Sequence, residues 1–165
     1  MARVTATSRM TEPEPDRPRV IAPPPILYLA ALAIGLGLHV AFPVHLFPRE
    51  VTLVGGVAAC VLGAALGGTG LRALRRAGTS QNPRRPTKAL VVSGSYRISR
   101  NPLYLSLLCL YVGIAFFVNG LWPFVLAVPL VAVLRLGVIV PEERYLERKF
   151  GEEYRRYRSR VRRWV

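Results

Sequence analysis

The stretch PLYLSLLCLYVGIAFFVNGLWPFVLAVPLVAVLRLGVIV, residues 102–140, decides the fold. It consists of two apolar runs separated by Asn119-Gly120, a dipeptide that is typical of a tight turn. Besides two tyrosines and one cysteine, its only ionisable side chain is that of Arg135. As helices, the two runs would be about 25 to 30 Å long, which is enough to cross the hydrocarbon core of a bilayer. We therefore predict a transmembrane hairpin whose two feet lie at the same membrane surface.

Two further apolar runs precede this hairpin, at residues 26–42 and 51–71. The second is rich in small residues spaced three or four apart, which permit close approach between membrane helices. These residues are Gly55, Gly56, Ala59, Gly63, Ala64 and Gly67. After the hairpin, apolar residues of the basic segment 142–165 recur at helical spacing. The sequence thus predicts an all-α integral membrane protein with about four transmembrane helices and an amphipathic C-terminal cytoplasmic helix.

The charges predict how the chain is oriented. A content of 52% hydrophobic residues with a formal net charge of +14 is typical of a membrane protein, whose charges collect in its loops. Cations concentrate in residues 72–100 and after Pro141. The positive-inside rule therefore predicts that both termini and the 72–100 loop are cytoplasmic, with the chain in the inner or plasma membrane. We expect the cations to contact anionic lipid headgroups rather than nucleic acid.

The chain is long enough for one membrane-embedded domain, which we expect over residues 23–165. Residues 1–22 contain prolines, charges of both signs and few apolar residues, and we predict a disordered cytoplasmic tail there. Cys60 and Cys109 fall in apolar runs, so we expect small buried hydrophobes rather than a disulfide or ligands. The two histidines belong to no Cys/His cluster, and no metal site is expected.

Polar residues stand at both feet of the hairpin. Residues 100–104, RNPLY, begin it, and Glu142 and Glu143 follow it. Asn-Pro fits a helix start, and acids fit a first helical turn, so each foot alone has a structural explanation. Arg135 precedes Glu142 by seven residues and is expected on the same helix face. An arginine within a membrane usually has a partner or a function, although its side chain can also snorkel to the surface. We predict that these side chains meet around a pocket at the water–lipid boundary, as in an enzyme.

Residues 90–104, LVVSGSYRISRNPLY, resemble the "LvtsGpYr..RHPxY" element of the isoprenylcysteine carboxyl methyltransferase family. The prokaryotic and phospholipid methyltransferases of that superfamily share this element. The end of the chain is similar to the family's "EE..L...FGeeY..Y...V" ending. The matching residues there are Glu142, Glu143, Leu146, Phe150, Gly151, Glu152, Glu153, Tyr154, Tyr157 and Val161. The resemblance covers about residues 78–161, which form the motif-bearing core of the domain.

The resemblance implies a membrane methyltransferase whose donor is S-adenosylmethionine, which becomes S-adenosylhomocysteine. The donor would lie in a cytoplasm-facing pocket beneath the last two helices. The implied cofactor site consists of Gln81, Tyr96, Arg100, Asn101, Pro102, Tyr104, Glu142 and Glu143, with Tyr154 covering it. Asn101 stands where the carboxyl methyltransferases usually have histidine, so this chain lacks a titrating imidazole at that position.

The implied acceptor is a lipid-like or isoprenoid molecule with a carboxylate or an amine, and it would enter sideways from the bilayer. An ammonium acceptor must lose a proton before it attacks, and Glu142 or Glu143 could act as the base. The same acids could instead hold the donor through its ammonium or ribose hydroxyls. Arg135 is a third candidate catalytic residue, which could anchor an acidic acceptor. The sequence leaves these roles open.

Two other hypotheses stand beside the methyltransferase. An NADPH-dependent lipid or steroid reductase has a related helical core, but it would need further polar sites for its larger cofactor. In a non-enzymatic membrane scaffold or transporter subunit, the acids would be mere flanking charges. The three hypotheses differ in the ligand they predict: a methyl donor, NADPH, or neither.

Overall fold

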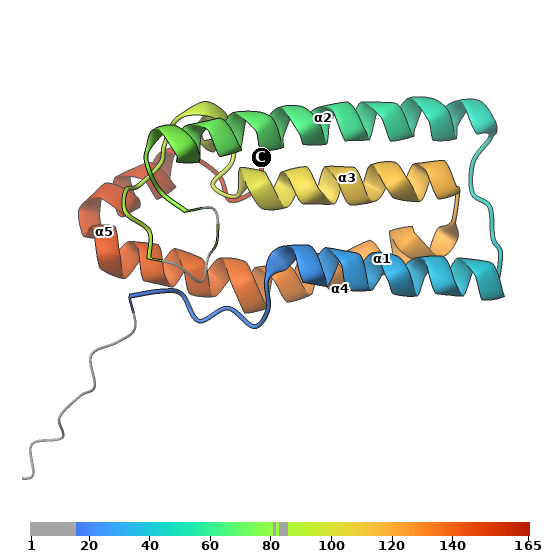
Figure 1. Cartoon of the computed structure of the whole chain (residues 1–165), viewed down its shortest axis with the longest axis horizontal. Coiled ribbons are helices and arrows are strands. Elements are labelled where there is room, and N and C mark those ends of the chain that lie inside the picture. The colour runs from blue at the N-terminus through green and yellow to red at the C-terminus, as the bar shows by residue number, and fades with distance from the viewer. Residues whose placement is uncertain (1–15, 81, 83–85) are drawn as a thin grey trace, which may run out of the picture.

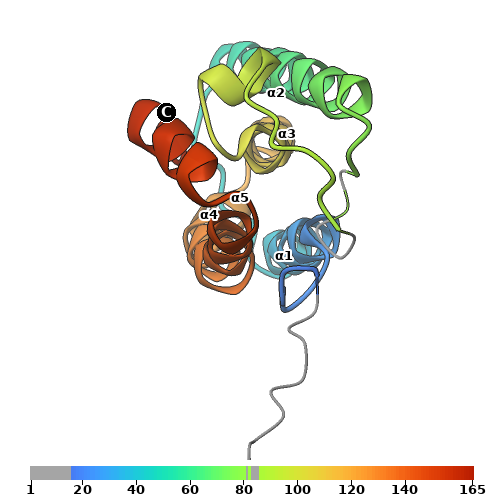
Figure 2. The same cartoon turned by 90° about the vertical axis from the view of Figure 1, so that its left-hand side faces the viewer.

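The computed structural model describes residues 16–80, 82 and 86–165, which form helices joined by loops. The elements are α1 (Pro24–Ala41), α2 (Arg49–Arg76), the 3-10 helix η1 (Gly94–Arg97), α3 (Pro102–Val118), α4 (Leu121–Leu134), the π-helix η2 (Arg135–Ile139) and α5 (Val140–Arg160). Helices α1 to α4 run side by side along the long axis, and α5 extends beyond them (Figure 1). Viewed from that end, α3 lies between α2 on one side and α1 and α4 on the other (Figure 2).

Within the described residues, three helices are long and apolar enough to cross a membrane: α1, α2 and the continuous helix Leu121–Arg160. Helix α3 is a shorter apolar helix of 17 residues. Large apolar side chains such as Val54, Val128 and Leu136 point outward and are more than two-thirds exposed. Apolar side chains on the outside of a helix are stable against the lipid of a bilayer, whereas their exposure to water would be unfavourable. The prediction of an all-α integral membrane protein is confirmed.

The glycines of α2 let α3 approach closely. A Cβ atom on Gly56 would lie 2.5 Å from the Phe117 ring, and one on Gly67 would lie 2.5 Å from Ser106 Oγ. Ser106 Oγ in turn donates a hydrogen bond to the Gly63 carbonyl at 2.7 Å. The glycines among the small residues of α2 therefore form the predicted packing face. Ala64, which was predicted to belong to the same face, is exposed on the outer side of α2.

The buried core joins α1, α3 and the long last helix. It contains Tyr28, Tyr111, Leu130, Leu134 and Val138. Both tyrosines donate to backbone carbonyls, Tyr28 to that of Tyr104 at 2.7 Å and Tyr111 to that of Pro123 at 2.8 Å. These bonds satisfy hydroxyl groups that would otherwise be costly to bury. The Tyr28 bond also ties α1 to the first turn of α3, beside the predicted pocket.

At the end of the bundle away from α5, the connecting loops close on one another. Asn119 adopts a left-handed φ of 53° between α3 and α4, which confirms the predicted turn. Its side-chain oxygen accepts from the N–H groups of Leu46 and Phe47 at 3.1 and 2.9 Å. The Trp122 indole donates to the Phe42 carbonyl at 2.7 Å. Polar side chains here serve the connections between helices.

The long last helix passes through Pro141, where the sequence pattern predicted its end. Helices α4, η2 and α5 follow one another without a break from Leu121 to Arg160. A proline lacks the N–H that would bond the carbonyl of Gly137 four residues earlier, and its ring crowds that carbonyl. The wide π turn of η2 relieves this crowding. The break lies instead at Gly151, whose φ of 51° kinks α5.

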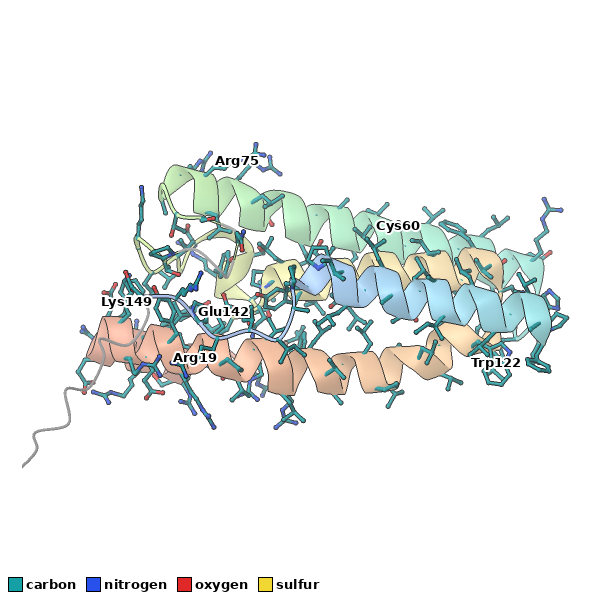
Figure 3. All side chains as sticks on the ribbon, turned by 60° about the horizontal axis from the view of Figure 1, so that its bottom comes forward. Arg19, Cys60, Arg75, Trp122, Glu142 and Lys149 are labelled. Atoms are coloured by element: carbon teal, nitrogen blue, oxygen red, sulfur yellow. The ribbon has the colours of Figure 1, made fainter. Side chains whose placement is uncertain are left out.

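The segment before α1 also differs from its prediction. Of the disordered tail predicted over residues 1–22, residues 1–15 lie outside the described part of the chain. Residues 16–22, which we call the N-terminal strap, pack along the long last helix, where Figure 3 labels Arg19. Pro18 is buried, Val20 packs against the core, and the Ile21 N–H donates to the Gly137 carbonyl at 3.1 Å. The carbonyl that Pro141 leaves without its helical donor thus binds the strap.

Candidate functional site

A pocket lies at the end of the bundle where α3 begins and α5 extends, opposite Trp122 (Figure 3). The space between its walls, with the open mouth included, is about 790 Å³. Its wall comes from the end of α2, the segment that follows it, η1, the start of α3, and α5. The lining residues are Leu74, Thr79, Ser80, Asn82, Thr87, Ala89, Leu90, Val91, Tyr96, Arg100, Asn101, Pro102, Leu103, Tyr104, Glu142, Glu143, Leu146, Tyr154 and Tyr157.

Helix η1 holds one wall of the pocket against α2. Gly94 has a φ of 62°, and a Cβ atom there would lie 3.0 Å from the Thr69 carbonyl oxygen, so glycine is required. The buried Ser95 Oγ donates to the Leu66 carbonyl at 3.0 Å. These contacts fix the residues that follow, and Tyr96 and Arg100 reach the pocket as a result.

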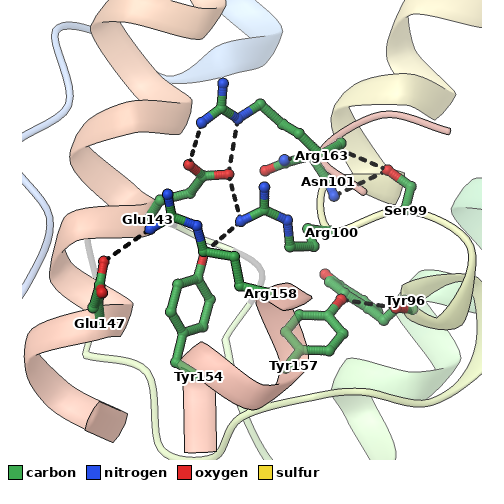
Figure 4. A network of polar contacts seen from close by, with 10 residues as sticks. All are labelled: Tyr96, Ser99, Arg100, Asn101, Glu143, Glu147, Tyr154, Tyr157, Arg158 and Arg163. Atoms are coloured by element: carbon green, nitrogen blue, oxygen red, sulfur yellow. Dashed lines mark hydrogen bonds and ion pairs between the residues drawn. The ribbon is translucent and has the colours of Figure 1, made fainter. Parts of the chain in front are cut away.

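Glu143 is held by two arginines (Figure 4). Arg100 Nη1 lies 3.1 Å from Glu143 Oε1. Arg163 donates to both carboxylate oxygens, through Nε to Oε1 at 3.0 Å and through Nη2 to Oε2 at 2.7 Å. The side chains of Arg100 and Glu143 are each 9% exposed. Because these charge-assisted bonds engage both of its oxygens, Glu143 organises the pocket wall.

The C-terminal segment folds back over the turn at residues 99–101. Asn101 Nδ2 and Ser99 Oγ both donate to the Arg163 carbonyl, at 3.0 and 3.1 Å. The Arg100 N–H donates to the Arg162 carbonyl at 3.0 Å. Asn101 precedes α3, but its side chain makes no capping hydrogen bond. The expected helix cap is therefore wrong for this side chain, which instead fastens the C-terminal segment to the pocket.

Glu142 differs from its neighbour. Its Oε2 accepts the Tyr104 hydroxyl proton at 2.8 Å, and no cation of the described residues pairs with it. It lies beyond the apolar part of the long helix, which ends at Val140. Burial in the pocket raises the pKa of Glu142 to about 7; the Tyr104 bond opposes this rise and the Glu143 charge adds to it. Glu142 thus has unused hydrogen-bonding capacity and titrates near neutral pH.

Two further features of the pocket lining are suited to binding a ligand. Arg100 Nε is buried and has no hydrogen-bond partner within the described part of the chain. Tyr96, Tyr154 and Tyr157 form an aromatic wall, in which the Tyr157 hydroxyl donates to the Tyr96 carbonyl at 2.7 Å. A molecule with a cation, a hydrogen-bond acceptor and a flat ring would complement the acid, the N–H and the aromatic faces.

The structure gathers most of the predicted site residues around this pocket. Its lining includes Tyr96, Arg100, Asn101, Pro102, Tyr104, Glu142, Glu143 and Tyr154. Gln81 lies outside the described residues. Arg135 is exposed on the outside of the helix and is not brought to the pocket. The π turn that begins at Arg135 adds one residue, which rotates Glu142 by about 100° away from the expected shared face. The exposed position fits the alternative of a snorkelling side chain.

Several lining or supporting residues were not foreseen from the sequence. Arg163 is one of many arginines in the basic tail, and nothing in the tail marks it as the partner of Glu143. Thr79, Ser80 and Thr87 belong to a segment without helical or strand periodicity. Tyr157 was part of the matched C-terminal pattern but was not assigned to the site. For Tyr157, the spacing of three residues from Tyr154 was the available signal.

Comparisons with known proteins indicate the family of the chain. A family model described as phospholipid methyltransferase matches residues 51–153. An uncharacterized protein of Haemophilus influenzae is 38% identical over 63 residues, which cover 38% of this chain and 100% of that relative. No solved structure matches the chain significantly.

Proposed function

The chain belongs to the phospholipid methyltransferase family and is therefore a membrane methyltransferase; from this premise we propose that S-adenosylmethionine is its methyl donor and that the acceptor is a lipid-like or isoprenoid molecule. The observation that carries the proposal is a pair of groups in one pocket that have no partner among the described residues: the Glu142 carboxylate has no cation, and Arg100 Nε has no hydrogen-bond acceptor. Together they offer one negative and one positive contact to a zwitterionic ligand.

The donor combines a sulfonium, an ammonium, a carboxylate and an adenine ring, and it supplies an electrophilic methyl group when bound. We assign the ammonium to Glu142 and the carboxylate to Arg100, which Glu143 keeps in place. Tyr96 and Tyr154 offer aromatic faces to the ring or the sulfonium. Asn101 would contribute through the turn that it fastens, because its amide nitrogen is already bonded to the Arg163 carbonyl.

Methyl transfer is an in-line displacement, for which the protein has to align two reactants and exclude water. Tyr154, which lines the pocket, is 1% exposed, and the segment after α5 accepts a hydrogen bond from the side chain of the lining residue Asn101. Of the two roles that the acids could have, we assign donor binding to Glu142, because its capacity is unused. Glu143, bound by two arginines, has little left for proton transfer.

We infer that the pocket faces the cytoplasm. The pocket end carries the cations of α5 and of the end of α2, including Arg75 and Lys149 (Figure 3), as the positive-inside rule requires for that side of the plasma membrane. The soluble donor would then enter from the cytosol. The acceptor would enter from the bilayer, towards the apolar lining residues Leu74 and Leu103.

Thermal unfolding of the purified protein with S-adenosylhomocysteine, and in parallel with NADPH, tests the donor. At about 100 times its Kd, a ligand specific for the folded state stabilises it by about 2.7 kcal/mol. We expect S-adenosylhomocysteine to raise the unfolding temperature and NADPH to leave it unchanged. A response to NADPH alone would also contradict the assignment of S-adenosylmethionine as the donor, because it is what the reductase hypothesis predicts. A folded sample that responds to neither ligand would contradict the donor assignment.

A further inference from the structure

Tyr145 lies on α5 one turn beyond Glu142 and outside the lining of the pocket. It is 3% exposed, and its hydroxyl is surrounded by three polar partners from three parts of the chain. It donates to Asp16 Oδ1 at 2.9 Å, and it accepts from Lys149 Nζ and from the Thr87 N–H, each at 3.1 Å. A tyrosine hydroxyl has one proton to donate, and here it also accepts twice, so its hydrogen-bonding capacity is filled.

The N-terminal strap supplies the acidic partner of this hydroxyl. Asp16 accepts from Lys149 Nζ through both carboxylate oxygens, at 2.6 and 2.8 Å. The hydrogen bond from Lys149 holds the pKa of the Asp16 carboxyl below its ordinary value. Farther along the strap, the Ile21 N–H bonds the Gly137 carbonyl, and a Cβ atom on Gly137 would collide with the Ile21 side chain. The strap is therefore fixed at both ends to the long last helix.

On the other side of Tyr145, Thr87 begins a wall of the pocket. Thr87, Ala89, Leu90 and Val91 all line it. Val91 is buried against Ala73 and Leu74 of α2, which fixes the far end of this segment. The bond from the Thr87 N–H to Tyr145 ties its near end to α5. Residues 87–91 thus span from α5 to α2 across the pocket.

We propose that Tyr145 is a positioning residue for the donor pocket, and that the N-terminal strap orients Tyr145. The inference rests on the proposed function for the identity of the ligand. The hydroxyl holds residues 87–91 at the distance from Glu142 that the donor requires, and Asp16 with Lys149 fixes the direction of the hydroxyl. A segment 129 residues earlier in the chain thereby sets the width of the pocket.

Tyr145→Phe removes the hydroxyl and keeps the ring. A suitable control is Tyr111→Phe, because Tyr111 is also 3% exposed and also donates one hydrogen bond, to the Pro123 carbonyl far from the pocket. Two quantities are measured on the full chain: the Kd of S-adenosylhomocysteine, and the rate of amide hydrogen exchange in peptides that cover residues 86–91. Asp16→Asn is measured in the same way.

We expect Tyr145→Phe to weaken S-adenosylhomocysteine binding about fivefold, the effect of one lost hydrogen bond, and to speed exchange in residues 86–91. Asp16→Asn should shift both quantities in the same direction by less, and Tyr111→Phe should shift neither. Unchanged exchange, or faster exchange with unchanged affinity, in Tyr145→Phe overturns the positioning role. A normal Asp16→Asn protein overturns the part assigned to the strap. If the wild-type chain binds no S-adenosylhomocysteine, the donor assignment fails, while the exchange rates still test whether Tyr145 holds residues 87–91.

Discussion

The two ends of the helix bundle use their polar residues differently. At the end with Trp122, the side chains of Asn119 and Trp122 bond the backbone of neighbouring loops. At the pocket end, two arginine side chains bind Glu143, but Glu142 and Arg100 Nε keep hydrogen-bonding capacity that no described residue uses. At the Trp122 end, His39 Nδ1 is also buried without a partner within the described residues. It differs from Arg100 Nε because it packs against Gly120 and does not line the pocket. Unused hydrogen-bonding capacity in a pocket, rather than polarity itself, distinguishes the candidate site from the structural end.

The largest effect is expected from removing the acid that holds the pocket end together. Glu143→Ala would leave Arg100 and Arg163 beside each other without their carboxylate, and breaking such a buried pair costs about 3–5 kcal/mol. The free energy of unfolding in detergent, measured by chemical denaturation, should fall by this amount. Glu147→Ala is the control, since its pair with Arg158 is more exposed and is worth less than about 1 kcal/mol. Equal stability of the two variants would contradict the structural role of Glu143.

Glu142→Gln should affect binding rather than folding. Losing one charge-assisted contact costs about 1.5–3 kcal/mol, so the Kd of S-adenosylhomocysteine should rise about 10- to 150-fold in a calorimetric titration. The unfolding temperature without ligand should not fall, because the ionised acid is disfavoured by burial. Glu153→Gln changes an exposed acid of the same helix and should bind normally. An unchanged Kd in Glu142→Gln would remove Glu142 from the donor site.

Because the pKa of Glu142 is raised, ligand binding at the pocket end should depend on pH. Since protonation near pH 7 removes the negative charge, the affinity for S-adenosylhomocysteine should fall by about tenfold per pH unit below 7. The affinity of Glu142→Gln should stay nearly constant over the same range. The free energy of unfolding of the ligand-free chain should change with pH in the opposite direction. The folded chain binds this proton more tightly than the unfolded chain, so the contribution of Glu142 to stability falls as the pH rises from about 4.5 to 7. Tighter ligand binding at pH 5.5 than at pH 7.5 would be incompatible with this role.

The smallest effect is expected at the other end. Asn119→Gly keeps a residue that tolerates the φ of 53° but removes the exposed hydrogen bonds to Leu46 and Phe47. The free energy of unfolding should fall by about 1 kcal/mol. Titration with S-adenosylhomocysteine should give the wild-type Kd, because the site lies at the far end of the bundle. A weaker Kd in this variant would show that the two ends are coupled.

Much of the fold follows from apolar runs and their boundaries. The run at residues 102–118 coincides with α3, because Asn-Pro precedes it and Asn-Gly follows it. The course of the chain through Pro141 was not predictable, because it depends on a π turn whose freed carbonyl finds a partner in Ile21, far away in sequence. The packing of the N-terminal strap was not predictable for the same reason, because it also depends on contacts with residues far away in sequence. The overall composition of residues 1–22 does not reveal that Pro18, Val20 and Ile21 make such contacts.

The sequence predicted that two chain segments come together at the candidate site. It did not predict which residue of that site binds which partner. Two feet of one hairpin must lie at the same surface, which brings Arg100 and Tyr104 near the acids. Adjacent helical residues point about 100° apart, so two identical acids in sequence acquire different partners in the fold. Which acid Arg163 binds depends on how the C-terminal segment folds back over Asn101, and no local pattern encodes this.

We propose above all that the chain methylates a lipid-like molecule with S-adenosylmethionine. The most direct test reconstitutes the purified protein in vesicles of membrane lipid extract and adds donor labelled in its methyl group. We predict that label enters the organic extract of the vesicles with the wild-type chain, and that much less does so with Glu142→Gln at the same protein concentration. A folded wild-type protein that leaves all of the label in the aqueous phase would contradict the claim.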